Sequence, residues 1–205
     1  MLQYWTPEPL FAGRSVAVLG NGPSLSMESI IDLDPRYVIA VNSAIRLCQD
    51  AHVLFSRDSS WCQKYSTLID SAWSPLKVTT KLDAAKERGM LLVRMERRDS
   101  FAAVGHPAIR YGMSSGHAAV SLAISMGAKE IVLYGFDCRF VKVNGKDRSQ
   151  WHDDYEEPRR QVYTTFVQGW RGWNAAAKAR GCRILNGTPG SAIDEFEFLE
   201  MAEAE

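Results

Sequence analysis

Ser15-Val-Ala-Val-Leu-Gly-Asn-Gly-Pro-Ser-Leu-Ser26 gives the clearest indication of the fold. Its apolar run at 16–19 is rich in Val and too short for a helix, so it predicts a buried strand. Gly20 and Gly22 permit a tight turn whose backbone N–H groups are free to approach a ligand. Ser24 is positioned to cap a helix that begins near Leu25. A strand, a glycine turn and a helix start are typical of anion binding, and a plain turn without a ligand is the alternative.

Bulk composition favours one soluble domain. The chain has 205 residues, is 46% hydrophobic, and carries 24 basic and 24 acidic side chains. Zero net charge gives no strong signal for nucleic acid. No apolar run approaches the roughly 18 residues of a membrane span, and the N-terminus does not resemble a signal peptide. The four scattered cysteines fit free thiols in a reducing compartment, so we expect a cytoplasmic protein.

Strand-like and helix-like segments alternate along the chain. This pattern predicts an α/β fold, a single Rossmann-like domain with a mainly parallel sheet and helices on both faces. The domain is expected to span 15–194, after an aromatic arm at 1–14 and before an acidic tail at 195–205 that we expect to fray. The arm either packs across the domain or binds a partner. Strands are expected at 16–19, 37–41, 53–55, 76–80, 91–95, 131–134 and 183–186, and helices from Leu25 and at 59–72, 81–88, 118–126 and 158–180.

Small polar residues follow several of the expected strands. Ligands bind at the carboxyl ends of strands in such folds, so these residues are candidates for binding a nucleotide or its phosphates. Turns also favour Asn, Asp, Ser and Gly, which is the simpler alternative. The candidates are Asn21, Gly22, Pro23, Ser24, Asn42, Ser43, Arg57, Asp58, Gly135 and Asp137.

A second helix start resembles the first in its chemistry. Ser114, Ser115 and Gly116 precede a clear helix, which predicts either a second anion site or an N-cap alone. Two such helix ends facing one crevice would suit a pyrophosphate or a nucleotide phosphate. Arg57 would add a charge-assisted contact, unless it pairs with a surface carboxylate instead.

His152 lies in a polar loop beside Asp153 and Asp154. A loop histidine near carboxylates is suited to act as a general base, and a solvated histidine without a role is the alternative. The two aspartates are alternatively suited to hold Mg²⁺ together with phosphate oxygens.

Three segments together resemble a known superfamily. Residues 18–25, 41–43 and 114–137 are similar to the DUF115 superfamily, which includes archaeal 6-hydroxymethylpterin diphosphokinases of the MptE type and the central domain of flagellin-modifying Maf proteins. The same segments resemble the family 42 bacterial sialyltransferases, over roughly residues 15–137 and a downstream histidine. Small uncharacterised phage and prophage proteins share the pattern over nearly the whole chain, including the ending at 186–194.

The sialyltransferase resemblance implies a transferase that moves a glycosyl group from a nucleotide-sugar to an unidentified hydroxyl acceptor. It implies that Asn21, Gly22 and Ser24 contact the phosphate and ribose, that Asn42 binds the donor, and that Ser115 and Gly116 hold the sugar or phosphate. His152 would be the base.

The chain departs from those enzymes in two respects. Arg139 stands where they carry a Tyr near the leaving phosphate, so Arg139 would have to offset that charge itself. The long segment that covers the sugar in those enzymes is also missing.

Two other functions stay open. The resemblance to the pterin enzymes implies an ATP- and Mg²⁺-dependent pyrophosphokinase with Asp137, Asp153 or Asp154 as metal ligands. A non-catalytic, phage-encoded binding or assembly protein, located in the host cytoplasm, is the third possibility. A homo-oligomer is compatible with all three.

Overall fold

The main sheet of this computed structural model contains eight strands, all parallel. The structure describes residues 3–31, 37–153 and 160–199. The strand order is β12-β11-β8-β1-β2-β3-β4-β5, and every neighbouring pair is parallel. This confirms the predicted Rossmann-like α/β fold. The strands are β1 (Ser15–Leu19), β2 (Tyr37–Val41), β3 (Val53–Ser56), β4 (Leu76–Thr79), β5 (Leu91–Leu92), β8 (Glu130–Tyr134), β11 (Arg183–Asn186) and β12 (Glu197–Phe198).

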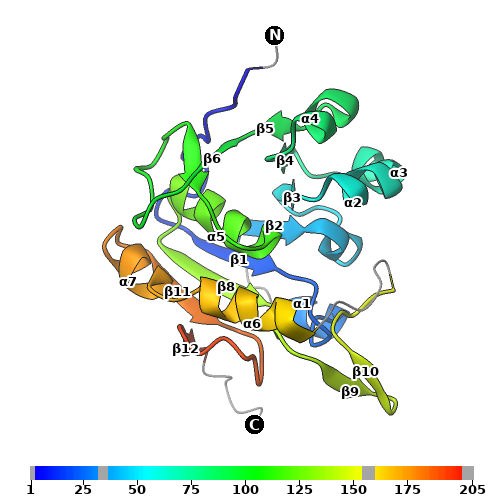
Figure 1. Cartoon of the computed structure of the whole chain (residues 1–205). Coiled ribbons are helices and arrows are strands. Elements are labelled where there is room, and N and C mark those ends of the chain that lie inside the picture. Colours follow the sequence, from blue (N-terminus) through cyan, green and yellow to red (C-terminus); the bar gives the residue numbers. More distant parts are fainter. Residues whose placement is uncertain (1–2, 32–36, 154–159, 200–205) are drawn as a thin grey trace.

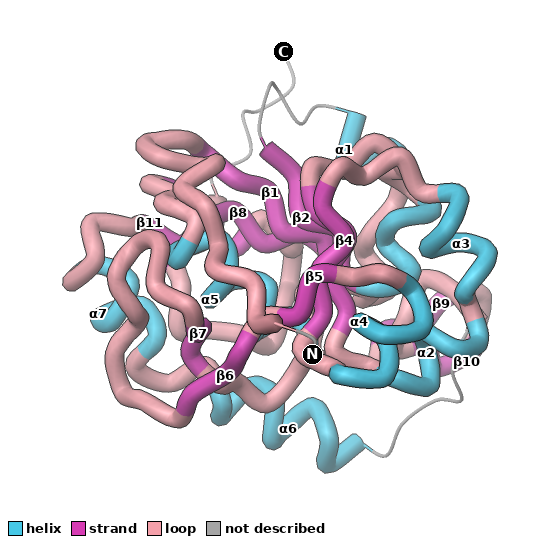
Figure 2. Tube along the Cα trace, turned by 90° about the horizontal axis from the view of Figure 1, so that it is seen from above, coloured by secondary structure: helices cyan, strands magenta, loops and turns pink. Residues whose placement is uncertain are grey.

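Helices cover both faces of the sheet, as Figures 1 and 2 show. Alternate residues of β1 face opposite sides, Val16 and Val18 in one core cluster and Ala17 and Leu19 in the other. Burial on both sides explains why the strand is apolar throughout. The first cluster packs on α5 (Ser115–Ser125) and α7 (Trp173–Lys178), and the second on the short helix η1 (Asn42–Arg46), α2 (Ser59–Lys64), α3 (Ser66–Ser71) and α4 (Leu82–Arg88).

Three expected elements are divided. The helix expected at 59–72 breaks at Tyr65 into α2 and α3. The long helix expected at 158–180 is α6 (Arg160–Gly169) followed by α7, because Gly172 takes a left-handed conformation (φ 75°) between them; its expected start at Pro158 lies outside the described residues. The strand expected at 91–95 splits into β5 and β6 (Arg94–Glu96), which leaves the main sheet to pair with β7 (Ala108–Arg110).

A β-hairpin lies within residues 141–157, the polar segment rich in turn formers that carries His152. β9 (Val141–Val143) and β10 (Lys146–Arg148) pair antiparallel around Asn144 and Gly145, which both have positive φ. Asn-Gly is the residue pair that favours this two-residue turn, so the sequence did carry a signal for the hairpin.

Both ends of the described chain pack on the domain. Trp5 N–H donates to the Leu92 carbonyl oxygen (2.7 Å), and Phe11 is fully buried. Near the other end, Phe196 is buried and β12 extends the sheet, so part of the segment expected as an acidic tail is ordered structure. Residues 200–205 lie outside the described part.

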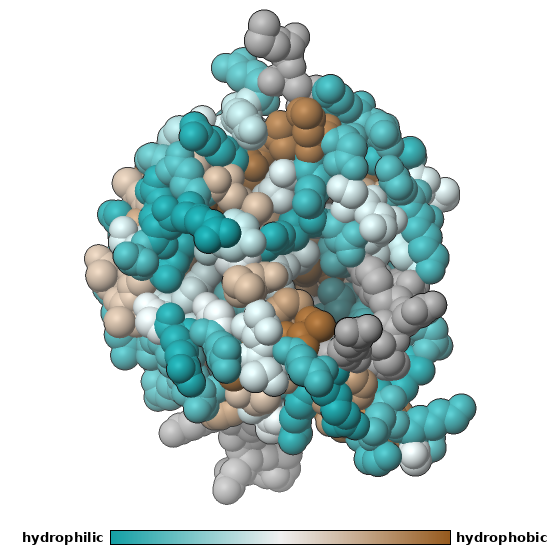
Figure 3. Space-filling view, in the orientation of Figure 1, coloured by the Kyte–Doolittle hydropathy of each residue, from teal (hydrophilic) through white to brown (hydrophobic). Residues whose placement is uncertain are grey.

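The face of the molecule in Figure 3 is mostly hydrophilic, with hydrophobic residues in small separate patches. Within residues 3–31, 37–153 and 160–199, no helix is long and apolar enough to cross a membrane. All four cysteines are free thiols, as the sequence predicted.

Candidate functional site

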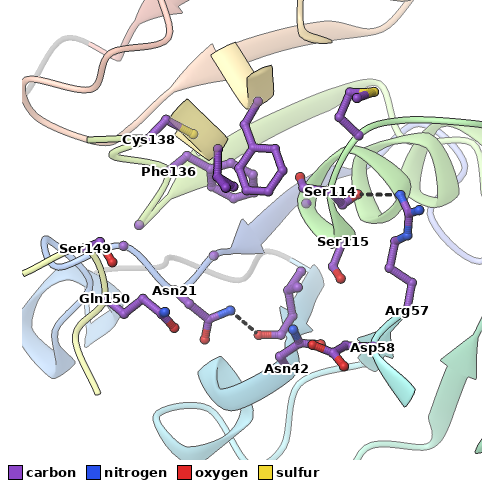
Figure 4. Close-up of a pocket in the computed structure, with 18 of the residues that line it drawn as sticks. Asn21, Asn42, Arg57, Asp58, Ser114, Ser115, Phe136, Cys138, Ser149 and Gln150 are labelled. Carbon is purple, nitrogen blue, oxygen red and sulfur yellow. Dashed lines mark hydrogen bonds between the residues drawn. The ribbon is translucent and has the colours of Figure 1, made fainter. Parts of the chain in front are cut away.

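A cleft of about 660 Å³ opens at the carboxyl ends of the central strands. It lies where β2 and β8 flank β1, the point at which the strand order changes direction, and such points bind ligands in open α/β sheets. Figure 4 shows Ser114, Ser115 and Arg57 on one side of the cleft and Ser149 and Gln150 on the opposite side. Nine of the predicted residues line it: Asn21, Gly22, Asn42, Arg57, Asp58, Ser114, Ser115, Gly116 and Gly135.

The glycine turn after β1 is packed against the end of β8. Gly20 N–H donates to the Tyr134 carbonyl oxygen and Gly22 N–H to that of Gly135, each at 2.7 Å. These two N–H groups are therefore not free for a ligand, contrary to the expectation from the sequence. The glycines are needed because a Cβ at Gly22 would lie 2.0 Å from a carboxylate oxygen of Asp137.

Asp137 occupies the position where the sequence predicted a bound anion. Its Oδ2 accepts hydrogen bonds from the Ser24 hydroxyl (2.8 Å) and the Ser24 N–H (3.3 Å). Ser24 therefore does not cap a helix. The helix α1 (Met27–Ile31) begins two residues later than expected, and Ser26 and Ser29 exchange the capping hydrogen bonds at its start. The protein's own carboxylate thus fills the first predicted anion site.

Burial raises the pKa of Asp137, against the opposing effect of its bonds from Ser24. The folded state then holds the proton more tightly than the unfolded chain. The contribution of Asp137 to stability is therefore fully present below its unfolded pKa and is lost as pH rises through its folded pKa.

We expect Asp137→Asn to become more stable relative to the parent as pH rises from about 3 to 7. The amide oxygen can still accept from Ser24 but carries no buried charge. Chemical denaturation at both pH values measures the difference. Asp147→Asn is the matched control, and its stability relative to the parent should fall as pH rises. The reason is that Lys142 and Arg160 lower the pKa of Asp147. A difference for Asp137→Asn that does not change with pH would contradict the argument.

The start of α5 keeps the geometry of an anion site. Ser114 caps the helix, since its side chain accepts from the His117 N–H. Ser115 and Gly116 begin the helix, so the helix itself does not satisfy their N–H groups, and both residues line the cleft. Arg57 donates to the carbonyl oxygens of Gly112 and Ser114. Both acceptors are neutral, so the charge of Arg57 acts on the cleft.

His117 supports Ser114 from inside the core. Its Nδ1 lies 2.8 Å from the Ser114 hydroxyl, and its ring stacks on Trp170 at 3.7 Å between centroids. Burial, with the nearby charges of Arg57 and Arg110, lowers the pKa of His117 to about 3. His117 is therefore neutral at physiological pH and positions the cap as an uncharged ring.

Asn21 connects the glycine turn to the loop that carries His152. Its Nδ2 donates to the Val41 carbonyl oxygen (2.9 Å), and its Oδ1 lies 3.2 Å from His152 Nε2. Because Oδ1 can only accept, Nε2 carries a proton, and in the neutral form of the ring the lone pair is at Nδ1. His152 is 7% exposed and does not itself line the cleft, but Asn21 and Gln150 beside it do.

The remaining predicted residues lie around the cleft rather than in its wall. Ser43 is fully buried and accepts from the Trp61 indole N–H (2.8 Å). Pro23, Ser24 and Asp137 do not line the cleft, and Arg139 lines a second cavity.

The described residues of the alternative magnesium set do not fit a metal site. Asp137 is committed to Ser24, and Asp153 is 84% exposed and pairs with Arg148. No group of three His, Cys, Asp or Glu side chains in the described ranges could hold a metal ion. Asp154 lies outside those ranges.

Several lining residues were missed from the sequence. Lys81 brings a second positive charge into the cleft directly after β4, although the sequence suggested a solvated helix from that position. Its position at the end of a strand was the signal that could have identified it. Tyr163 and Phe166 reach the cleft from α6, and Ser149 and Gln150 follow the hairpin.

Asn42 has an unusual backbone at the cleft. It is a non-glycine residue with φ 51°, directly after β2. Such conformations concentrate at functional sites, where the surrounding structure holds them.

Two solved structures share the fold of the chain. No protein-family model matches the sequence, and no curated protein matches it. The Maf glycosyltransferase from Magnetospirillum magneticum AMB-1 has a TM-score of 0.62 at 13% identity, over 97% of this chain and 35% of that one. The sialyltransferase CST-II, in a variant complexed with CMP, has a TM-score of 0.55 at 16% identity, over 91% of this chain and 86% of that one. The chain thus spans about a third of the Maf protein, and it has the Rossmann-like fold that these two glycosyl-transferring proteins share.

Proposed function

We propose that this chain transfers a glycosyl group from a nucleotide-sugar to a hydroxyl acceptor. The observation that carries the proposal is the cleft at the end of β1, in which the start of α5, Arg57 and Lys81 meet. Unsatisfied N–H groups and two cations favour a phosphate there. The fold agrees, because one structure that shares it is a sialyltransferase complexed with CMP.

The donor phosphate is assigned to Ser115 and Gly116, with Arg57 beside them. The glycine turn is the less favourable position, because the Gly20 and Gly22 N–H groups donate to carbonyl oxygens at the end of β8. The Asp137 carboxylate, which is bonded to Ser24, would also repel a phosphate there. Asn21 and Asn42, which also line the cleft, are assigned to the nucleoside part of the donor.

The transfer needs a base and a stabilised leaving group. The acceptor oxygen forms a bond to the anomeric carbon as the base removes the hydroxyl proton. The bond from that carbon to the phosphate oxygen breaks, and the phosphate keeps the electron pair, with its charge offset by Arg57 and the start of α5. We assign the base to His152, because Asn21 fixes the ring in the tautomer with its lone pair at Nδ1.

A thermal-unfolding panel tests the proposal. It uses CMP, CDP, UDP, GDP, ATP and the corresponding nucleotide-sugars, each with Mg²⁺ and with EDTA. A ligand at about 100 times its Kd adds roughly 2.7 kcal/mol, which raises Tm by several degrees. We expect a shift that survives EDTA. A shift with ATP and Mg²⁺ alone would favour the pyrophosphokinase, and no shift at all would favour a non-catalytic, phage-encoded binding or assembly protein.

Arg57→Ala is expected to weaken nucleotide binding by about tenfold or more, because it removes a charge-assisted contact to phosphate. Arg97→Ala is the matched control. Both guanidinium groups lie over the Tyr111 ring, at 5.3 and 5.2 Å from its centroid, but only Arg57 lines the cleft. Titration calorimetry with the nucleotide that the panel identifies gives both affinities. Equal affinities for the two variants would remove Arg57 from the site.

A further inference from the structure

A second cavity of about 420 Å³ adjoins the cleft. The two share Cys138 and Tyr163 as lining residues. Arg139, Arg160 and Arg171 line the second cavity, and no acidic residue within 3–31, 37–153 and 160–199 does. They come from the segment after β8, the start of α6 and the turn between α6 and α7. The fold therefore brings three guanidinium groups together beside the proposed site of transfer, in a chain whose overall net charge is zero.

Among the described residues, at least two of these charges have no ion-pair partner. Arg160 pairs with Asp147 and lies 4.4 Å from the centroid of the Phe140 ring. Arg139 and Arg171 are exposed, and neither forms an ion pair with any described residue. The carboxylate that acts on Arg139 is Asp137, which is already hydrogen-bonded to Ser24. A guanidinium group that has no ion-pair partner can bind a carboxylate or a phosphate through two parallel hydrogen bonds.

The backbone conformation of its neighbour and contacts with a nearby loop position Arg139. Cys138, directly before it, has φ 48°, a conformation that costs energy for a residue with a side chain. The guanidinium lies against Gly190, where a Cβ would come within 2.5 Å of Nη2. The loop that carries Gly190 is fixed to the end of β8, since Ala192 N–H donates to the Asp137 carbonyl oxygen (2.8 Å) and the Ser191 hydroxyl to that of Phe136 (2.6 Å).

We propose that the second cavity binds an anionic group of the acceptor, a carboxylate or a phosphate. The acceptor then extends past Cys138 and Tyr163, so that its hydroxyl reaches the cleft. The volume of the second cavity lies in the range of small-molecule sites and suits a charged monosaccharide unit. The identification of the bound molecule as the acceptor rests on the proposed function. The binding of an oxyanion in the second cavity can be tested independently.

Titration calorimetry at low salt tests it with three probes: glucuronate, glucose 6-phosphate and glucose. We expect one or both charged sugars to bind and neutral glucose to bind at least tenfold more weakly. A preference between the charged probes identifies carboxylate or phosphate as the natural group. Arg139→Gln/Arg171→Gln is expected to weaken binding of the charged probe at least tenfold. Arg97→Gln, which removes a charge outside both cavities, should not.

Nucleotide affinity separates this inference from the proposed function. The double variant should bind the nucleotide as the parent does, while Arg57→Ala should bind the charged sugar as the parent does. If charged sugars bind through Arg139 and Arg171 but no nucleotide binds, the result would support the oxyanion site and contradict the proposed glycosyl transfer. Nucleotide binding with no difference between glucose and the charged sugars would overturn the oxyanion site alone. Loss of charged-sugar binding in Arg57→Ala, with no loss in the double variant, would also overturn it.

Discussion

Gly22→Ala is expected to lower the free energy of unfolding by about 2–3 kcal/mol. The new Cβ would lie 2.0 Å from Asp137 Oδ2 and 2.7 Å from the Gly135 carbonyl oxygen. Neither atom can move away cheaply, because Asp137 is hydrogen-bonded to Ser24 and the Gly135 oxygen accepts from Gly22 itself. The substitution therefore separates the ends of β1 and β8. Urea denaturation of parent and variant measures the cost.

Gly89→Ala is the matched control for the backbone effect of alanine. Gly89 ends α4 with φ 63°, and a Cβ there would meet nothing within 4 Å. Its cost should be about 1 kcal/mol, from the strained φ alone. The cost of Gly22→Ala should also shrink in an Asp137→Ala background, since one of the two clashing groups is gone. If Gly22→Ala and Gly89→Ala lowered the free energy of unfolding equally, the result would contradict the close packing of the glycine turn.

The contact between Gly22 and Asp137 illustrates what the sequence could not predict. The strand before Gly22 and the strand before Asp137 were each recognised from a short apolar run, because that signal is local. The two residues are 115 positions apart, and their contact depends on β8 lying next to β1 in the sheet. The sequence therefore predicted both strand ends but not that one would supply the anion for the other.

The residues around α5 were more predictable than those around α6. Ser114 and Gly116 belong to one helix start, and that helix formed as expected. Tyr163 reaches the cleft from α6, which ends at Gly169, whereas the sequence predicted a continuous helix through 180. Arg139 was placed by resemblance near the leaving phosphate. The left-handed conformation of Cys138 follows no local sequence signal, and Arg139 lines the second cavity.

His152→Ala is expected to lower kcat for glycosyl transfer by about 10²- to 10⁴-fold, the usual effect of removing a general base. Nucleotide affinity should stay within about twofold of the parent, because the proposed role concerns the acceptor proton and not the donor. Transfer kinetics and calorimetry with the identified donor measure the two quantities. His106→Ala is the matched control. Its Nδ1 accepts from the Ala108 N–H, and His106 does not line the cleft.

Asn21→Ala tests how His152 would be positioned. Without Oδ1 of Asn21, the proton is no longer fixed at Nε2, and the ring loses one of the contacts that orient it. We expect a smaller loss of kcat than for His152→Ala, and no further loss when both substitutions are combined. Effects that multiply in the double variant would show that Asn21 acts separately from His152, through its own contact with the donor.

Asp58 is the competing base, because its carboxylate lines the cleft while His152 lies behind Asn21. Asp58→Asn is a clean variant, since an asparagine can keep the cap of α2 by accepting from the Trp61 N–H as Oδ1 does now (3.0 Å). If His152 is the base, Asp58→Asn retains most of the activity and the pH dependence of kcat changes only in His152→Ala. If Asp58→Asn loses activity by 10²-fold or more while His152→Ala does not, the base is Asp58 and His152 orients Asn21.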